Sequence, residues 1–241
     1  MEVDLFIPCF VDQIEPQIGQ NLITILEHVG CNVHYNPKQT CCGQPQFNSG
    51  YTQETRELAR KFLKDFEGDR VIVSPGGSCT GFIKRRYASL FDTPAEKEAA
   101  EKLSNRIYDI CDFLVNILHI TDLGATFNGK VTVHDSCSAL REYGLTTEPR
   151  TLLQNVKGLE IVEMEESTTC CGFGGTFSIK QKDISSAMVE QKVRFAVESG
   201  AEYITGTEFS CLMNIKAYIE RNNINIKPIH IVNILSNFEH V

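Results

Sequence analysis

The sequence predicts an α/β protein made of two tandem, duplicated halves. Each half is expected to hold a parallel, Rossmann-like sheet with a cysteine site at the carboxyl ends of its strands. Two observations support this fold class. Short apolar runs alternate with segments of helical periodicity, an order typical of parallel sheets with right-handed crossovers. In addition, one pattern of cysteines occurs twice along the chain.

Six runs are short, apolar and rich in β-branched residues, as expected for strands buried on both faces of a parallel sheet. They are Val3–Ile7, Asn32–Tyr35, Arg70–Val73, Lys130–Val133, Leu159–Val162 and Tyr203–Thr205. Two segments between them carry an apolar stripe at helical spacing, and each stripe ends at a glycine. The stripes are Ile18, Leu22, Ile25, Leu26 and Val29 before Gly30, and Met188, Val189, Val193 and Val197 before Gly200. Asp183 is the expected N-cap of the second helix.

Eight of the ten cysteines form the pattern C…CC…C twice, with corresponding cysteines 128, 129 or 132 positions apart. Thr40–Gly43 and Thr169–Gly172 both read TCCG around the paired cysteines. This repeat is far longer than the ~20–50 residues of a solenoid repeat, so it indicates duplication of a domain. We expect a first cysteine-rich domain at residues 1–125 and a second at 126–241. The stretch 93–129, which is helical and partly charged, is expected to contain the linker.

Composition narrows the class of function. A net charge of −8 disfavours nucleic acid as a partner, because phosphate binding needs a basic surface. The sequence starts without a secretory signal, and its longest apolar stretch, near 110–120, is too short to span a bilayer. We therefore expect a cytoplasmic protein without a membrane span. In that reducing compartment, many thiols indicate metal binding or redox chemistry rather than structural disulfides.

The eight repeated cysteines follow predicted strands in the same order in both halves. Residues just past the carboxyl ends of parallel strands gather at one edge of the sheet, so four thiols per half are expected to meet. The predicted metal and cofactor ligands are Cys9, Cys41, Cys42 and Cys79 in the first half, and Cys137, Cys170, Cys171 and Cys211 in the second. The two cysteines outside the repeat, Cys31 and Cys111, are expected to be small buried apolar residues.

Helix N-termini and glycine-rich turns near these cysteines are expected to supply N–H groups to thiolates. The glycines concerned are Gly43, Gly76, Gly77, Gly172, Gly174 and Gly175. Four thiolates suit either zinc or an iron–sulfur cluster. Structural zinc usually draws on close C-x₂₋₄-C knuckles, which are absent from the repeat, so the sequence favours a cluster. Zinc at one site remains an alternative.

Several stretches resemble a known family over both halves of the chain. They are Ile7–Asp12, Cys41–Gly50, His134–Cys137, Leu140–Glu142, Cys170–Ser178 and Ser210–Asn214. They resemble the cysteine-rich CCG domains found in heterodisulfide reductase, in the iron–sulfur subunits of glycolate oxidase and in anaerobic glycerol-3-phosphate dehydrogenase. The more specific resemblance is to the lactate utilisation protein A family, short proteins made only of two such domains.

The resemblance implies an iron–sulfur electron-transfer subunit of a complex that oxidises L-lactate to pyruvate. It implies up to two [4Fe–4S] clusters on the eight cysteines, with a ferredoxin-like iron–sulfur subunit and a third subunit as partners. Heterodisulfide reductase-type domains carry an additional cysteine in a C-x-x-C ending. Here the positions three before and three after Cys79 and Cys211 hold no cysteine, which puts a five-cysteine cluster in doubt but not a four-thiolate one.

Other residues are secondary candidates. His134 and Asp135 are able to relay a proton or contact a substrate, although a capping aspartate and a hydrogen-bonded histidine are the commoner outcome. Arg141 is a candidate for binding a lactate carboxylate, and the run 84–86 is a basic helix face for an acidic partner or for solvent.

No glycine motif has nucleotide-binding spacing, so we expect neither NAD nor ATP. The alternatives to electron transfer are a zinc-binding scaffold and a thiol–disulfide oxidoreductase.

Overall fold

The computed structural model describes residues 1–238 and contains two four-stranded, fully parallel sheets. The first sheet has the order β2-β1-β3-β4 and the second has the order β6-β5-β7-β8. The register of the central strands corresponds as well. Val3 pairs with Val71 in the first sheet, and Val131 pairs with Tyr203 at the corresponding place in the second sheet. The predicted α/β class with two parallel-sheet halves is therefore confirmed.

The first half of the chain forms one sheet and its helices. Its elements are β1 (Glu2–Leu5), α1 (Cys9–Ile14), α2 (Gln17–His28), β2 (Asn32–Tyr35), α3 (Gln44–Asn48), α4 (Thr52–Asp65), β3 (Val71–Ser74), α5 (Gly77–Leu90), α6 (Pro94–Ser104), β4 (Ile107–Asp109), α7 (Ile110–Asp112) and the π-helical turn η1 (Phe113–Ile117). The stretch expected to be a linker carries β4, because Ile107 pairs with Ile72 at the sheet edge. The position of the linker within that stretch stays a prediction.

The second half repeats this order with small changes. Its elements are β5 (Thr126–Val133), the π-helical turn η2 (Ala139–Tyr143), α8 (Glu148–Leu153), β6 (Lys157–Ile161), α9 (Phe177–Lys180), α10 (Lys182–Glu198), β7 (Tyr203–Gly206), α11 (Phe209–Asn222), β8 (Lys227–His230) and α12 (Ile231–Leu235). Helix α10 has Gln181 rather than Asp183 at its N-cap. The domain limits 1–125 and 126–241 stay a prediction, and residues 239–241 lie outside the described part.

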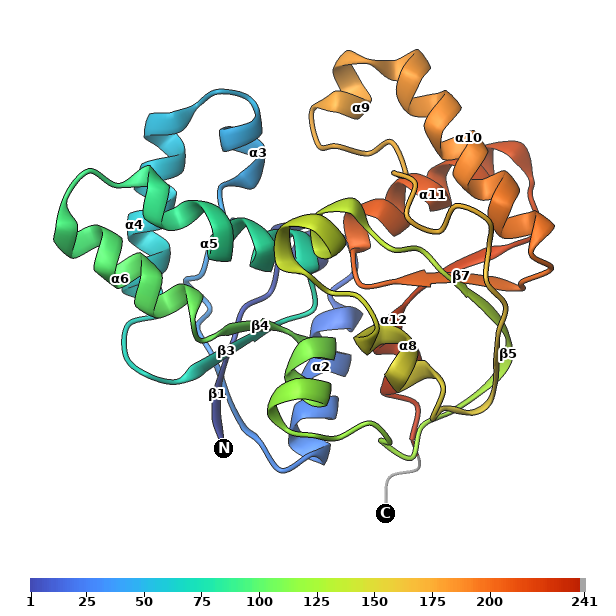
Figure 1. Cartoon of the computed structure of the whole chain (residues 1–241), viewed down its shortest axis with the longest axis horizontal. Coiled ribbons are helices and arrows are strands. Elements are labelled where there is room, and N and C mark those ends of the chain that lie inside the picture. Colours follow the sequence, from blue (N-terminus) through green and yellow to red (C-terminus); the bar gives the residue numbers. More distant parts are fainter. Residues whose placement is uncertain (239–241) are drawn as a thin grey trace.

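Alternate residues of each strand point into different cores, as the two-residue period of a strand requires. Val73 and Val131 belong to a central core that both halves build, whereas Ile72 faces an outer core of the first half and Ile204 an outer core of the second. Figure 1 shows the result as two lobes, one with α3 to α6 and one with α9 to α11, joined below by α2, α8 and α12.

The two halves also exchange helix contacts near the carboxyl ends of their strands. Helix α5 packs on η2, and α11 packs on α1. The first contact is close because α5 has glycines at the interface: a Cβ atom on Gly77 would lie 2.6 Å from Cβ of Ala139, and one on Gly81 would lie 2.9 Å from the Tyr143 nitrogen. These contacts bring the cysteine-bearing ends of both sheets face to face. No helix within residues 1–238 combines the length and apolar character needed to cross a bilayer.

Candidate functional site

All eight repeated cysteines line one cavity between the two halves. The cavity encloses about 920 Å³ of space between protein atoms, part of it open to solvent. Each half contributes a quartet of thiols, which we call the first quartet (Cys9, Cys41, Cys42 and Cys79) and the second quartet (Cys137, Cys170, Cys171 and Cys211). The structure thus brings together the cysteines that the repeat singled out.

The first quartet comes from three separate segments. Cys9 begins α1, the Cys41–Cys42 pair precedes α3, and Cys79 lies in the first turn of α5. The Sγ atoms of Cys9 and Cys41 are 3.7 Å apart, and those of Cys42 and Cys79 are 3.3 Å apart. Cys79 therefore lies inside a helix start rather than before it.

The second quartet has the same origin in the other sheet. Cys137 precedes η2, the Cys170–Cys171 pair lies in the loop before α9, and Cys211 is in the first turn of α11. Its thiols interact in the corresponding order, Cys137 with Cys170, Cys170 with Cys171, and Cys171 with Cys211.

The two TCCG turns present a backbone donor to a thiol in each half. The Gly43 N–H donates to Sγ of Cys41, and the Gly172 N–H donates to Sγ of Cys170, both at 3.4 Å. Both glycines have a left-handed φ, +87° and +82°, a conformation that strongly favours glycine. These two glycines act as the sequence predicted. Gly76 instead packs against Pro8, as Gly77 packs against Ala139.

No lysine or arginine is among the described residues that line the cavity. The pKa values of the thiols in the first quartet are therefore set mainly by the other thiols and by burial. The hydrogen bond from Cys42, assisted by Cys9 and the Gly43 N–H, lowers the pKa of Cys41. Hydrogen bonds to Cys41 and then burial raise the pKa of Cys9, and bonds to Cys41 and Cys79 followed by burial raise that of Cys42. Thiolates so close repel one another, so ionising a whole quartet requires a cation. The donor set therefore fits a soft metal centre.

The spread of the thiols bears on which centre fits. Around one zinc ion with bonds of ~2.3 Å, tetrahedral sulfurs are ~3.8 Å apart. Within residues 1–238, one set of three metal-binding side chains has its ligand atoms all within 4.8 Å of one another: His134, Cys171 and Cys211. No three thiols of the first quartet are that close together.

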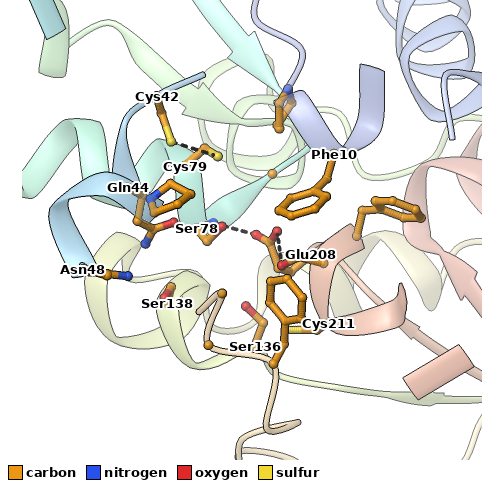
Figure 2. A pocket seen from close by; sticks show the side chains of 18 of the residues that line it. Phe10, Cys42, Gln44, Asn48, Ser78, Cys79, Ser136, Ser138, Glu208 and Cys211 are labelled. Carbon is orange, nitrogen blue, oxygen red and sulfur yellow. Dashed lines mark hydrogen bonds between the residues drawn. The ribbon is translucent and has the colours of Figure 1, made fainter. Parts of the chain in front are cut away.

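The other polar side chains that line the cavity are uncharged, with the exception of Glu208. Glu208 is buried between the quartets and accepts the Ser78 N–H at 2.8 Å and the Ser210 hydroxyl at 3.0 Å (Figure 2). Apart from the cysteines, Glu208 is the one ionisable side chain among the described residues that line the cavity. Phe10 and Phe173 meet edge to face there, with centroids 5.6 Å apart. Sequence reasoning missed Glu208 as a site residue.

The positions where related domains carry an additional cysteine have other roles here. Glu208, three residues before Cys211, joins the halves as described. Asn214, three residues after it, donates its side-chain amide to the Cys171 carbonyl at 2.9 Å. Phe82, three residues after Cys79, is buried against Phe47. Each quartet therefore has four thiols and no fifth.

The secondary candidates have mixed outcomes. Asp135 forms a two-pronged ion pair with Arg150 at 2.8 and 2.9 Å and accepts the Ser167 hydroxyl at 2.7 Å. Burial opposes its ionisation, but these hydrogen bonds outweigh burial and lower the pKa of Asp135. Arg141 is exposed and does not line the cavity. Lys84 is not a solvated face residue, since its ammonium donates to the Ile107 carbonyl and lies over the Tyr108 ring.

His134 lies behind the second quartet and is almost completely buried. Neither ring nitrogen has a hydrogen-bond partner among the described residues, although the Ser167 carbonyl is close enough to affect it. Burial, with the nearby Lys192 ammonium, lowers the pKa of His134 to about 3. The ring is therefore neutral and is not the hydrogen-bonded histidine that was expected as the commoner outcome.

Cys31 and Cys111 lie in the central core, as expected of small apolar residues. Burial raises the pKa of both thiols. All ten cysteines are free in the structure.

Comparison with known proteins agrees with the repeat. The cysteine-rich CCG domain model matches residues 3–84 and 131–216. Lactate utilization protein A of Macrococcus caseolyticus is 44% identical over 238 residues, covering 98% of this chain and 97% of that protein. Lactate utilization protein A of Bacillus subtilis is 41% identical over 237 residues, covering 98% and 99%. Glutamate racemase from Francisella tularensis aligns with a TM-score of 0.38 at 9% identity, covering 98% of this chain and 78% of the racemase, which is too weak a likeness to inform the fold.

Proposed function

This chain belongs to the lactate utilization protein A family, and from that premise we propose that it is an iron–sulfur electron-transfer subunit in the oxidation of L-lactate to pyruvate. The relatives carry lactate utilisation in their name. The finer assignment is supported by two corresponding thiol quartets at a shared cavity, and by a first quartet in which no three thiols lie within 4.8 Å of one another.

The side chains of the cavity divide the work of such a subunit. The eight cysteines would hold two [4Fe–4S] clusters, which supply one-electron transfer when bound. The N–H groups of Gly43 and Gly172 donate to Sγ of Cys41 and Cys170, and such contacts to a ligating sulfur would tune the reduction potential. Phe10 and Phe173 add an apolar surface to the wall of the cavity.

Lactate itself is expected to bind on a partner subunit. A bound carboxylate needs a cationic or strongly donating side chain, yet Glu208 is the charged group besides the cysteines among the described lining residues, and it repels an anion. Oxidation of lactate releases two electrons and two protons, and two clusters provide a path for the electrons. The partners we propose are a ferredoxin-like iron–sulfur subunit and a third subunit.

The test is anaerobic purification followed by iron, sulfide and zinc analysis and electron paramagnetic resonance. We expect brown protein with about four irons per occupied half. Cys41→Ser should empty the first half and Cys170→Ser the second, each halving the iron. Cys31→Ala, in the core and outside both quartets, is the matched control and should retain all the iron. Colourless, iron-free protein prepared without air would contradict the proposal.

A zinc-binding scaffold is the second candidate, and one observation favours it in the second half. His134, Cys171 and Cys211 place three ligand atoms close enough for a single ion. Stoichiometric zinc that disappears in Cys171→Ser, together with lactate-dependent growth unaffected by Cys41→Ser, would support that function instead.

Thiol–disulfide exchange is a third candidate because Cys42 and Cys79 have neighbouring sulfurs. This chemistry requires that the reacting thiols are not themselves ligands of a metal. Alkylation that abolishes activity without releasing metal would support it, whereas protection of the eight thiols by bound iron supports electron transfer.

A further inference from the structure

The two halves are not equivalent behind their thiols. The residue just after β1 is Phe6, and the residue just after β5 is His134. The two residues occupy corresponding positions in the two halves. The Phe6 N–H donates to the Val73 carbonyl at 3.0 Å, and the His134 N–H donates to the Thr205 carbonyl at 2.7 Å. Val73 and Thr205 are themselves corresponding residues of β3 and β7. A buried phenyl ring in one half thus corresponds to a buried imidazole in the other.

A second difference lies one helix further back. A Cβ atom on Gly43 would face Thr55 and Leu58 of α4, and one on Gly172 would face Ser185 and Met188 of α10. This correspondence, a shift of 130 positions, places Lys192 where the first half has Phe62. Both side chains are fully buried. In the first half Phe6 and Phe62 pack edge to face at 4.9 Å, so the region behind the first quartet is apolar.

The buried ammonium of Lys192 is held in place by backbone oxygens. Its Nζ donates to the carbonyls of Glu166 and Ser167 at 2.7 and 3.1 Å. These residues precede the Cys170–Cys171 pair in the same loop, and the ammonium interacts with Cys170, Cys171 and Cys211 through charge. Asp135, which also interacts with the ammonium through charge, is already paired with Arg150. Glu208 accepts hydrogen bonds from both halves, and its charge acts on Cys211 in the direction opposite to that of Lys192.

Positive charge and hydrogen-bond donors near cluster sulfur stabilise the reduced, more negative form of a cluster. We propose that His134 and Lys192 raise the reduction potential of the centre in the second half above that of the centre in the first, so that an electron shared between them resides in the second half. This inference rests on the proposed function, because it needs a redox-active centre in each half. The step moves one electron: the first centre is oxidised, the second is reduced, and no bond or proton changes.

The test compares centres one at a time. Cys170→Ser leaves the first centre and Cys41→Ser leaves the second, and each protein is loaded anaerobically and titrated with a reductant under electron paramagnetic resonance. We expect the Cys41→Ser protein to be reduced at a higher potential than the Cys170→Ser protein. Equal potentials, or the opposite order, would overturn the inference.

Exchange of the divergent residues tests the cause. In the Cys41→Ser protein, His134→Leu and Lys192→Met should each shift the remaining centre to a lower potential, and His134→Gln, which keeps an N–H donor, should shift it less than His134→Leu. In the Cys170→Ser protein, Phe6→His should shift the first centre upward, and this variant does not depend on the second half tolerating a substitution. Unchanged potentials in fully loaded variants would contradict the assignment.

The outcomes separate the two proposals. If the wild-type protein binds no reducible iron, the proposed function fails and the inference fails with it. If both halves bind reducible iron at the same potential, electron transfer stands and the inference alone is rejected.

Discussion

Cys42 and Cys79 are 37 positions apart in the sequence, yet their Sγ atoms lie 3.3 Å apart at the edge of the first sheet. A loop and the first turn of α5 bring them together, with the Tyr87 hydroxyl of the same helix donating to the Cys42 carbonyl at 2.8 Å. The first quartet is thus tied to a buried part of the fold.

This proximity predicts the oxidation products of the metal-free protein. Chelation followed by exposure to air should link Cys42 to Cys79, because thiolate attack needs neighbouring sulfurs. Cys31 and Cys111 should stay reduced, since both are buried in the central core. Peptide mapping by mass spectrometry would identify the bonds. A disulfide that joins the two quartets, or one to Cys111, would contradict the arrangement.

Substitution of Gly172 should affect both stability and metal retention. A Cβ atom at Gly172 would lie 2.7 Å from the Ser185 carbonyl, at a φ of +82°. Gly200→Ala is the matched control because φ there is +76° but nothing lies within 4 Å. We expect about 1 kcal/mol of lost stability from the backbone strain alone in the control and clearly more in Gly172→Ala.

Urea unfolding and iron analysis of both variants provide the measurement. The Gly200→Ala protein should keep all its iron, whereas Gly172→Ala should lose iron from the second half, because the Gly172 N–H no longer reaches Cys170. Equal losses of stability in the two variants would show that the contact with Ser185 is not limiting.

His230 should make the stability depend on pH. Its ring accepts the Val232 N–H at Nδ1 and lies 3.1 Å from the Pro75 carbonyl through Nε2, and burial lowers the pKa of His230 to about 4. Because the folded pKa is below the unfolded value, the unfolded chain binds more protons, and stability is lost as pH falls below about 6.5. By pH 5.5 the loss should be about 1 kcal/mol.

His230→Asn removes the titration while leaving a side-chain acceptor for the Val232 N–H. The difference in unfolding free energy between wild type and this variant, measured at pH 7.5 and 5.5, isolates the histidine from other acid-sensitive groups. The difference should change by about 1 kcal/mol in favour of the variant at the lower pH. A difference that is independent of pH would mean that His230 is not buried in its neutral form.

Glu208 should contribute to stability by joining the halves. In Glu208→Ala the Ser78 N–H loses its acceptor in a partly buried place, at a cost of about 1 kcal/mol. Glu208→Gln retains an acceptor oxygen and should lose less. Chemical unfolding of both variants would test this, and equal stability of alanine and glutamine variants would show that the hydrogen bond contributes nothing.

Most of the fold and the thiol positions could be predicted because they depend on patterns that recur along the chain. All six predicted strands are present. The missed strands β4 and β8 are edge strands, one of three residues and one that contains Pro228, and edge strands give weak sequence patterns. The expected apolar stripe of α10 was partly wrong. Val197, which was expected to be in the stripe, is 45% exposed, and Lys192, which was not, is fully buried.

The residues that distinguish the two halves could not be predicted in the same way. Lys192 is compatible with an exposed helix position in sequence, and its burial is favoured by the carbonyls of Glu166 and Ser167, which come from a distant segment. Glu208 and Ser78 come together across the two halves, a contact that no local pattern encodes. A comparison of the halves position by position, with Phe6 against His134, was the one available signal.

The reciprocal packing of α5 on η2 and of α11 on α1 is the geometry of a closed two-fold dimer whose subunits have become one polypeptide. In a homodimer every substitution appears on both sides of the axis. Covalent fusion removes that constraint, so one side can carry an imidazole and an ammonium while the opposite side carries phenyl rings.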